Sequence, residues 1–247
     1  TLKSYQISRT PIQAHGKSIQ GAGRKKNDDR FLITPITEEY LLIAVSDGMG
    51  GHPNGDKAAE IIIERLQALD IRQEDKALLL HNALHMADGV ITAEVATNPD
   101  SAGMGATATS ALLNKNMVHW AHIGDSRMYL ARQGSLRQVT RDHTFVQGQI
   151  DAGHISPQEA INHPFAHVLE QCIGCIDTNI EHGSFAALPG DSILVCSDGL
   201  FRNLAEDQLL DILDSGQSPA EQVECLLDFS EANAPIDDAT VIVAFIC

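Results

Sequence analysis

The sequence predicts a protein of the α+β class. Helical and strand-like patterns occur in separate blocks of the chain and do not alternate, which argues against a doubly wound α/β fold. Short turns, such as those at 114–116 and 133–134, join successive strand patterns, and connections this short build antiparallel sheets. At 247 residues, of which 43% are hydrophobic, the chain is long enough for one large domain with its own core.

Four segments carry the apolar spacing of amphipathic helices. In the first, Ile62, Leu66 and Leu69 recur every three to four residues, which places them on one helix face. The second ends before Pro99, because the residue before a proline avoids the helical conformation. Helices are therefore predicted over 55–69, 75–97, 206–213 and 219–229, and a shorter one begins at Ser156-Pro157.

Short apolar runs between turn residues predict the strands. The runs at 30–34 and 40–46 are expected to pair as a hairpin, and the β-branched run at 240–246 is expected in the middle of a sheet. Residues 1–22 are interpreted as irregular, with at most a short strand near 5–8. The other strands are predicted over 106–113, 117–123, 127–132, 136–140, 180–185 and 192–196.

The segment 142–176 differs from the rest of the chain. Glycine, histidine and proline are scattered through it and the periodicity is weak. We interpret it as a lid or flap inserted into a single domain that spans 1–247, because long irregular segments in compact domains usually cover a functional site.

Charge and hydropathy exclude two classes of partner. The formal net charge is −16 at pH 7, whereas a nucleic-acid binder needs a basic face to displace counterions. No apolar run approaches the roughly 18 residues of a membrane span, so no membrane partner is expected.

The number and spacing of the cysteines indicate, less strongly, their redox state and the location of the protein. The five cysteines are an odd number and no start typical of a signal peptide is present, which together indicate reduced thiols and a cytoplasmic location. The C-x-x-C pair of Cys172 and Cys175 has no second such pair, so we interpret both as packing thiols and not as a zinc or redox site.

Aspartates stand at the ends of four predicted strands. Asp47 ends the run at 40–46 and is followed by a glycine-rich turn that begins at Gly48; Asp125, Asp198 and Asp237 also adjoin strands. A single aspartate at a turn more often only caps that turn, so only the four aspartates together indicate a metal site. If these ends meet, we expect them to hold Mg²⁺ or Mn²⁺, and two such ions bridged by one carboxylate lower the pKa of a water that can attack phosphorus.

Three further residues fit that chemistry. Arg24 can bind phosphate in a bidentate manner, and Asp29, five residues later, can hold metal-bound water. His52 follows the glycine turn and has a suitable pKa for a general acid. The alternatives are a solvated basic loop around Arg24 and a hydrogen-bonded loop histidine at position 52.

Seven motifs, in order, resemble those of bacterial metal-dependent protein phosphatases of the 2C type, and the resemblance runs from about residue 21 to the C-terminus. It implies a four-layer αββα sandwich, in which two antiparallel sheets pack face to face between helices. The motifs are Arg24-x-x-Asn27-x-Asp29, Ser46-Asp47-Gly48-Met49-Gly50-Gly51-His52, Gly105-Ala106-Thr107-Ala108-Thr109, Gly124-Asp125-Ser126-Arg127, Thr140-x-Asp142-His143, Cys196-Ser197-Asp198-Gly199-Leu200 and Asp237-Asp238-Ala239-Thr240.

The resemblance implies hydrolysis of phosphoserine and phosphothreonine in proteins that a serine/threonine kinase has phosphorylated. By position, Asp47 would bridge two metal ions and the Gly48 carbonyl would bind one of them. Asp198 and Asp237 would complete the second ion, and Asp125 with Asp198 would hold a third, weaker one. Arg24 would bind the phosphate, and the flap at 142–176 would control access.

Three residues depart from the family pattern: Asp238 replaces a usual Asn, Asp28 replaces a usual Glu or Gln, and Phe165 follows Pro164 where an Arg is frequent. The Asp238 change and the altered flap motivate a first alternative, a catalytically weak, metal-binding regulatory domain. A second alternative is a two-metal phosphodiesterase, which shares the metal chemistry.

Overall fold

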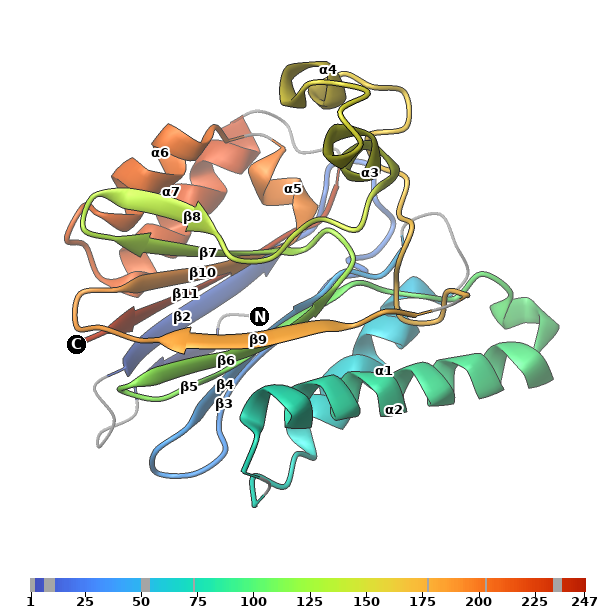
Figure 1. The fold of residues 1–247 in the computed structure, drawn as a ribbon, viewed down its shortest axis with the longest axis horizontal. Helices are drawn as coiled ribbons and strands as arrows, with labels where there is room; N and C mark the ends of the chain where they lie inside the picture. The colour runs from blue at the N-terminus through green and yellow to red at the C-terminus, as the bar shows by residue number, and fades with distance from the viewer. Residues whose placement is uncertain are drawn as a thin grey trace.

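The computed structural model describes most of the chain as two β-sheets packed face to face, with helices on both outer sides (Figure 1). The α+β class and the four-layer αββα arrangement are therefore confirmed. The described residues are 3–6, 12–49, 54–72, 74–176, 178–202, 204–232 and 237–247.

The first sheet has six strands in the order β1-β2-β11-β10-β7-β8, and all neighbours are antiparallel. The final strand, β11, lies between β2 and β10, as expected. The interpretation of residues 1–22 as irregular is wrong, because β2 pairs with β11 along its whole length. The short strand expected near 5–8 is found at 3–6, and residues 7 and 8 lie outside the described part. The strands are β1 Lys3–Gln6, β2 Ile12–Ile19, β7 Arg127–Arg132, β8 Ser135–Gln138, β10 Ser192–Cys196 and β11 Ala239–Ile246.

The second sheet has five strands in the order β3-β4-β5-β6-β9. The expected hairpin of β3 and β4 is confirmed. Strands β6 and β7 follow one another in the sequence but lie in different sheets, because Gly124, with φ of 102°, turns the chain out of one sheet and into the other. The strands are β3 Arg30–Pro35, β4 Leu41–Ser46, β5 Ala108–Leu113, β6 Met117–Ile123 and β9 Glu181–Ala186.

Helices cover the outer faces of both sheets (Figure 1). The long pair α1 and α2 packs on the five-stranded sheet, and α5 and α7 pack on the six-stranded sheet together with α6. The sequence did not predict α3. The bounds are α1 Gly55–Gln67, α2 Lys76–Thr97, η1 Pro99–Ser101, α3 Phe145–Asp151, α4 Pro157–Ile161, α5 Asp198–Phe201, α6 Glu206–Leu213 and α7 Pro219–Ala232. Within the described ranges, no helix has the length and apolar character needed to cross a bilayer.

Three apolar layers hold the sandwich together. Leu42 of β4 packs with Ile62 and Leu84 in the layer between the five-stranded sheet and its helices, and Ile43, the next residue, packs between the two sheets. This alternation follows from the strand geometry, in which successive side chains point to opposite faces. Full burial of each such side chain stabilises the fold by about 1.5–3 kcal/mol, so β4, buried on both faces, is a central element of the core.

The antiparallel register brings several strand ends to one end of the sandwich. Ser46, the last residue of β4, lies opposite Arg30, the first residue of β3. In the other sheet, Cys196 at the end of β10 lies opposite Val241 near the start of β11. The residues that follow β4 and β10 and those that precede β3 and β11 therefore gather at the same end.

Candidate active site

The aspartates predicted from the sequence meet at this end of the sandwich. The pKa of Asp47 is raised well above its usual value, first by burial and then by the charges of Asp29, Asp198, Asp125 and Asp237. Burial also raises the pKa of Asp198, and the charge of Asp237 adds to this shift. These five carboxyl groups come from both sheets and lie within electrostatic reach of one another, as the sequence analysis expected.

Backbone hydrogen bonds fix the turn that carries Asp47. The Asp47 carbonyl accepts from the Thr107 N–H at 2.9 Å, and the Met49 N–H donates to the Gly105 carbonyl at 3.0 Å, so the turn is held on both sides of Gly48. A Cβ on Gly48 would lie 2.4 Å from the backbone of Gly55, so only glycine fits there. The rest of the glycine turn and His52, the candidate general acid, lie outside the described residues.

Asp29 lies between the two sheets, beside Asp198. Its Oδ2 atom accepts hydrogen bonds from Ser197 Oγ at 2.8 Å and from Thr240 Oγ1 at 2.6 Å. Burial raises the pKa of Asp29 to about 7, although these two hydrogen bonds oppose the shift. Ser197 and Thr240 therefore orient Asp29, and both belong to motifs that the sequence analysis had singled out.

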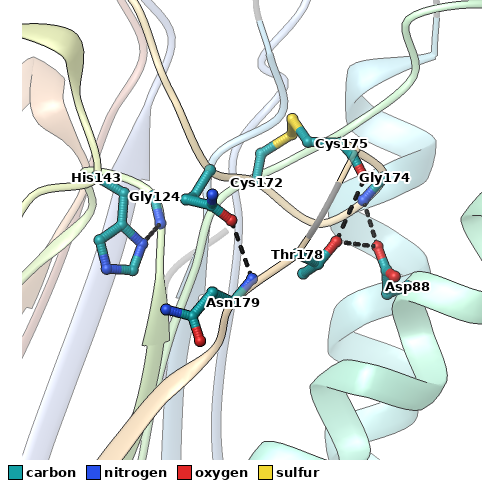
Figure 2. Close-up of a disulfide and its surroundings, with 9 residues drawn as sticks. Asp88, Gly124, His143, Cys172, Gly174, Cys175, Thr178 and Asn179 are labelled. Atoms are coloured by element: carbon teal, nitrogen blue, oxygen red, sulfur yellow. Dashed lines mark hydrogen bonds between the residues drawn. A yellow bond between two sulfur atoms is a disulfide. The ribbon is translucent and has the colours of Figure 1, made fainter.

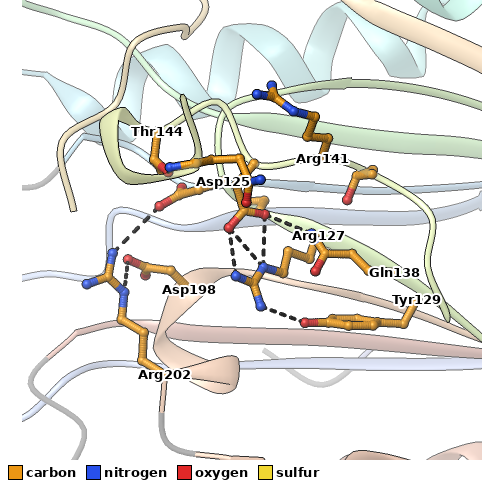
Figure 3. A network of polar contacts seen from close by, with 12 residues as sticks. Asp125, Arg127, Tyr129, Gln138, Arg141, Thr144, Asp198 and Arg202 are labelled. Atoms are coloured by element: carbon orange, nitrogen blue, oxygen red, sulfur yellow. Dashed lines mark hydrogen bonds and ion pairs between the residues drawn. The ribbon is translucent and has the colours of Figure 1, made fainter. Parts of the chain in front are cut away.

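Two arginines contact the acidic group. Arg24, which is 26% exposed, donates from Nη2 to Asp237 Oδ1. Arg202 forms ion pairs with Asp198 at 2.8 Å and with Asp125 at 3.6 Å (Figure 3). Arg202 was not predicted from the sequence. Its position four residues after Asp198, one helical turn away, is the signal that could have identified it.

A buried histidine supports the turn that carries Asp125. The His143 N–H donates to the Gly124 carbonyl at 2.8 Å, and the Gly124 N–H donates to His143 Nδ1 at 3.2 Å. Burial lowers the pKa of His143, which keeps the imidazole neutral and able to accept. His143 thus has a structural contact to the site, through the turn that precedes Asp125.

Asp142, at the start of the segment 142–176, pairs with Arg127 of β7. Arg127 Nε lies 2.9 Å from Asp142 Oδ1 and its Nη2 lies 2.7 Å from Oδ2, a bidentate arrangement. The guanidinium also stacks on Phe201, 3.7 Å from the ring centre, and donates to the Tyr129 hydroxyl. This pair fixes where the segment leaves the sandwich.

The other end of the segment contains a disulfide between Cys172 and Cys175 (Figure 2). The interpretation of these two residues as reduced packing thiols is therefore wrong. Gly174, with φ of 90°, turns the chain so that the two Cα atoms are 5.2 Å apart, within the range for disulfides. The Gly174 N–H donates to Asp88 of α2 at 2.8 Å, which attaches this turn to the helix layer.

A family model described as protein phosphatase 2C matches residues 16–232 of the chain. The chain belongs to the protein phosphatase 2C family. It is 35% identical over 223 residues to the serine/threonine protein phosphatase PstP of Mycobacterium tuberculosis, an alignment that covers 87% of this chain and 43% of PstP. It is 31% identical over 241 residues to the serine/threonine phosphatase stp of Listeria welshimeri, with 94% of each chain covered.

The structural comparison agrees with the family assignment. The crystal structure of the catalytic domain of PstP in complex with two manganese ions superposes with a TM-score of 0.84 at 33% identity, and the match covers 95% of this chain and 97% of that one. The chain spans less than half the length of full PstP and nearly all of the Listeria protein.

The donor groups of this protein phosphatase 2C member fit divalent metal ions. Asp29 and Asp198 each have a buried Oδ1 atom without a hydrogen-bond partner among the described residues, whereas Asp28 Oδ1 lies 3.4 Å from Lys26 Nζ. An unpaired buried carboxylate oxygen is unfavourable, and oxygen donors are the ones that Mg²⁺ and Mn²⁺ prefer. Among the described residues, no group of three Asp, Glu, His or Cys side chains is arranged to coordinate a metal ion directly. The structure therefore brings candidate ligands to one region without forming a complete coordination site.

Proposed function

We propose that this chain is a metal-dependent phosphoprotein phosphatase that hydrolyses phosphoserine and phosphothreonine. The observation that carries the proposal is the meeting of Asp47, Asp198 and Asp237 at one end of the sandwich, with Arg24 against Asp237. Membership in the protein phosphatase 2C family supports it, as do relatives named as serine/threonine phosphatases.

Two ions of Mn²⁺ or Mg²⁺ are the proposed cofactors, as in the PstP structure with two manganese ions. Asp47 and the Gly48 carbonyl would hold the first ion, and Asp47, Asp198 and Asp237 the second. When bound, the ions neutralise phosphate charge and lower the pKa of water, which is the chemistry that hydrolysis of a phosphate monoester needs. Asp29, oriented by Ser197 and Thr240, would accept hydrogen bonds from water beside the ions.

Arg24 is the proposed phosphate-binding residue. Its guanidinium is partly exposed beside Asp237, so it can move from that carboxylate to an incoming phosphate, for which its planar donor pair is suited. His52 remains our candidate for the general acid that protonates the leaving serine or threonine oxygen; it follows the Asp47 turn in sequence.

We further propose that residues 1–247 act as one phosphatase domain with a flap over 142–176. Helices α3 and α4 of this segment stand outside the two sheets at the acidic end (Figure 1). Two hydrogen bonds close its base, from Phe145 to Val168 and from Glu170 to His143. Ile161 and Phe165 are 71% and 54% exposed, so the flap offers apolar side chains to a protein substrate.

The proposed substrates are proteins phosphorylated by serine/threonine kinases, and the cytoplasmic location expected from the sequence stays a prediction. The acidic composition disfavours nucleic acid as a substrate.

The proposal is tested with the variant Asp47→Asn. Wild-type protein should hydrolyse an aryl phosphate and a phosphothreonine peptide with Mn²⁺, and should lose both activities when the ion is chelated. Asp47→Asn should lower the rate by about a hundredfold or more, because it removes the charge shared by both ions. Asp207→Asn, an exposed change in α6, is the matched control.

Wild-type turnover by Asp47→Asn would contradict the assignment of the site. Binding of Mn²⁺ without any turnover by the wild type would instead favour the regulatory domain, and preference for a bis-aryl over a mono-aryl phosphate would favour the phosphodiesterase.

A further inference from the structure

Asp125 and Asp198 bring a pair of buried carboxylates together from the two different sheets. Asp125 follows β6 and is 5% exposed, and Asp198 follows β10 and is 8% exposed. Burial and the charge of Asp198 both raise the pKa of Asp125, so ionising both carboxyl groups without a positive charge nearby is unfavourable. Two such groups need a positive charge beside them to stay ionised.

A guanidinium from the chain itself lies beside this pair. Arg202 Nε is 2.8 Å from Asp198 Oδ2, and Arg202 Nη2 is 3.6 Å from Asp125 Oδ2 (Figure 3). Its side chain is 37% exposed, so one side faces solvent while the other faces the two carboxylates. The charge of Arg202 lowers the pKa of both aspartates and so opposes the effect of burial.

The short helix α5 holds Arg202 in this position. Asp198 begins the helix and the Arg202 N–H donates to the Asp198 carbonyl at 3.1 Å, so the two side chains lie one turn apart. A Cβ on Gly199 would lie 2.1 Å from the Asp238 carbonyl oxygen, which shows how closely the helix backbone approaches the chain before β11. Ser230 Oγ of α7 also donates to the Gly199 carbonyl, at 3.1 Å. Arg202 is thus placed by a fixed backbone.

We propose that Arg202 takes the place of a third metal ion between Asp125 and Asp198 and excludes it. Family resemblance assigns these two carboxylates to a third, weaker ion, but here a guanidinium that stays charged at all physiological pH values already contacts both of them. The inference rests on the proposed two-ion site and adds that this chain works with two ions, with Arg202 as a positioning residue for Asp125 and Asp198.

The test counts Mn²⁺ ions bound to the full chain by isothermal titration calorimetry, with circular dichroism to confirm folding. Wild-type protein should bind two ions. Arg202→Gln, which removes the charge at similar size, should bind a third, at least about tenfold more tightly than any third ion in the wild type. The double variant Arg202→Gln with Asp125→Asn should return to two. Arg72→Gln, in an exposed pair with Asp70 in the segment that follows α1, should behave as the wild type.

A second variant keeps the test decisive if Arg202→Gln does not fold. Asp125→Asn alone should leave the ion count of the wild type unchanged, because Arg202 and not an ion faces that carboxylate. The inference is wrong if Asp125→Asn removes an ion from the wild type, or if folded Arg202→Gln gains none. Failure of the proposed function gives a different result: Asp47→Asn would then leave the ion count unaltered.

Discussion

The carboxylate of Asp238 accepts a hydrogen bond of 2.8 Å from the backbone N–H of Asp28. Its other oxygen accepts from the Gly21 N–H at 2.9 Å, and the side chain is buried. The two bonds clamp both ends of the loop that carries Arg24. Asp238, which stands where the family usually has Asn, therefore directs its negative charge at the backbone of this loop. Its two carboxylate oxygens accept from the two backbone N–H groups, of Gly21 and Asp28.

We predict that Asp238→Asn loosens the Arg24 loop. An amide has one acceptor oxygen, so its NH₂ group would face a backbone N–H, and the loss of a charge-assisted bond costs about 1–3 kcal/mol. The free energy of unfolding in urea should fall by that amount, and KM for an aryl phosphate should rise more than kcat falls. The matched control is Asp228→Asn on the exposed face of α7, which should change neither quantity. An Asp238→Asn protein with wild-type KM and stability would show that the clamp has no role.

The position of the acidic centre could be predicted from the sequence because its strands are short apolar runs with an aspartate close to one end. Asp47 follows such a run at 40–46, and Asp237 precedes another. Strand β2 could not be predicted in this way. Gln13, His15 and Lys17 interrupt its apolar residues, and it becomes a strand through pairing with β11, the last segment of the chain.

The contacts that support the site could not be predicted from the sequence either. The pair of Arg127 with Asp142 and the pair of Arg202 with Asp125 join residues from different elements, and no local pattern specifies which carboxylate an arginine reaches. The disulfide depended on the left-handed turn at Gly174, which the sequence Cys-Ile-Gly-Cys permits but does not require.

The stability of the metal-free protein should depend on pH through Asp125. Burial, followed by the charge of Asp198, raises the pKa of Asp125 to about 8, from 3.8 for an ordinary aspartate. The folded state therefore binds more protons than the unfolded state between these values, so this contribution is fully present below pH 3.8 and is lost as the pH rises through 8. With a chelator present, Tm should be lower at pH 8.5 than at pH 6.

Substitution of Asp125 tests whether this carboxyl group causes the pH dependence of Tm. In Asp125→Asn the fall in Tm between pH 6 and pH 8.5 should be smaller, since the amide does not titrate, whereas Asp211→Asn on exposed α6 should retain the full fall. A wild-type Tm that rises over this range would contradict the sign of the shift.

Gly48 and Gly89 should respond in opposite ways to alanine. A Cβ at position 48 meets the backbone of Gly55 at 2.4 Å, so Gly48→Ala must displace either the Asp47 turn or the start of α1. It should lower both stability and Mn²⁺ affinity. Position 89 lies inside α2 with open space around a Cβ, so Gly89→Ala should stabilise the protein by about 0.5–1 kcal/mol and leave Mn²⁺ binding unchanged. Urea unfolding and calorimetry measure both effects, and equal responses of the two variants would refute the steric argument.

The pair of Arg127 with Asp142 should matter more for stability than any exposed ion pair of the flap. Asp142 is buried and accepts two bonds from the Arg127 guanidinium, so Arg127→Ala leaves an uncompensated charge and should cost about 3–5 kcal/mol. Arg127→Lys should recover only part of this, because lysine lacks the planar pair of donors. Arg141→Ala, which breaks the exposed pair with Asp151, should cost less than about 1 kcal/mol.

A double variant separates lost charge compensation from lost packing on Phe201. If the cost of Arg127→Ala arises from the buried charge of Asp142, adding Asp142→Asn should restore part of the stability, because the neutral amide does not need the guanidinium. If it arises from the stacking on Phe201, the second change should only add to the loss. Urea unfolding of the four proteins in this cycle measures the coupling, and a coupling near zero would show that the two charges do not depend on each other.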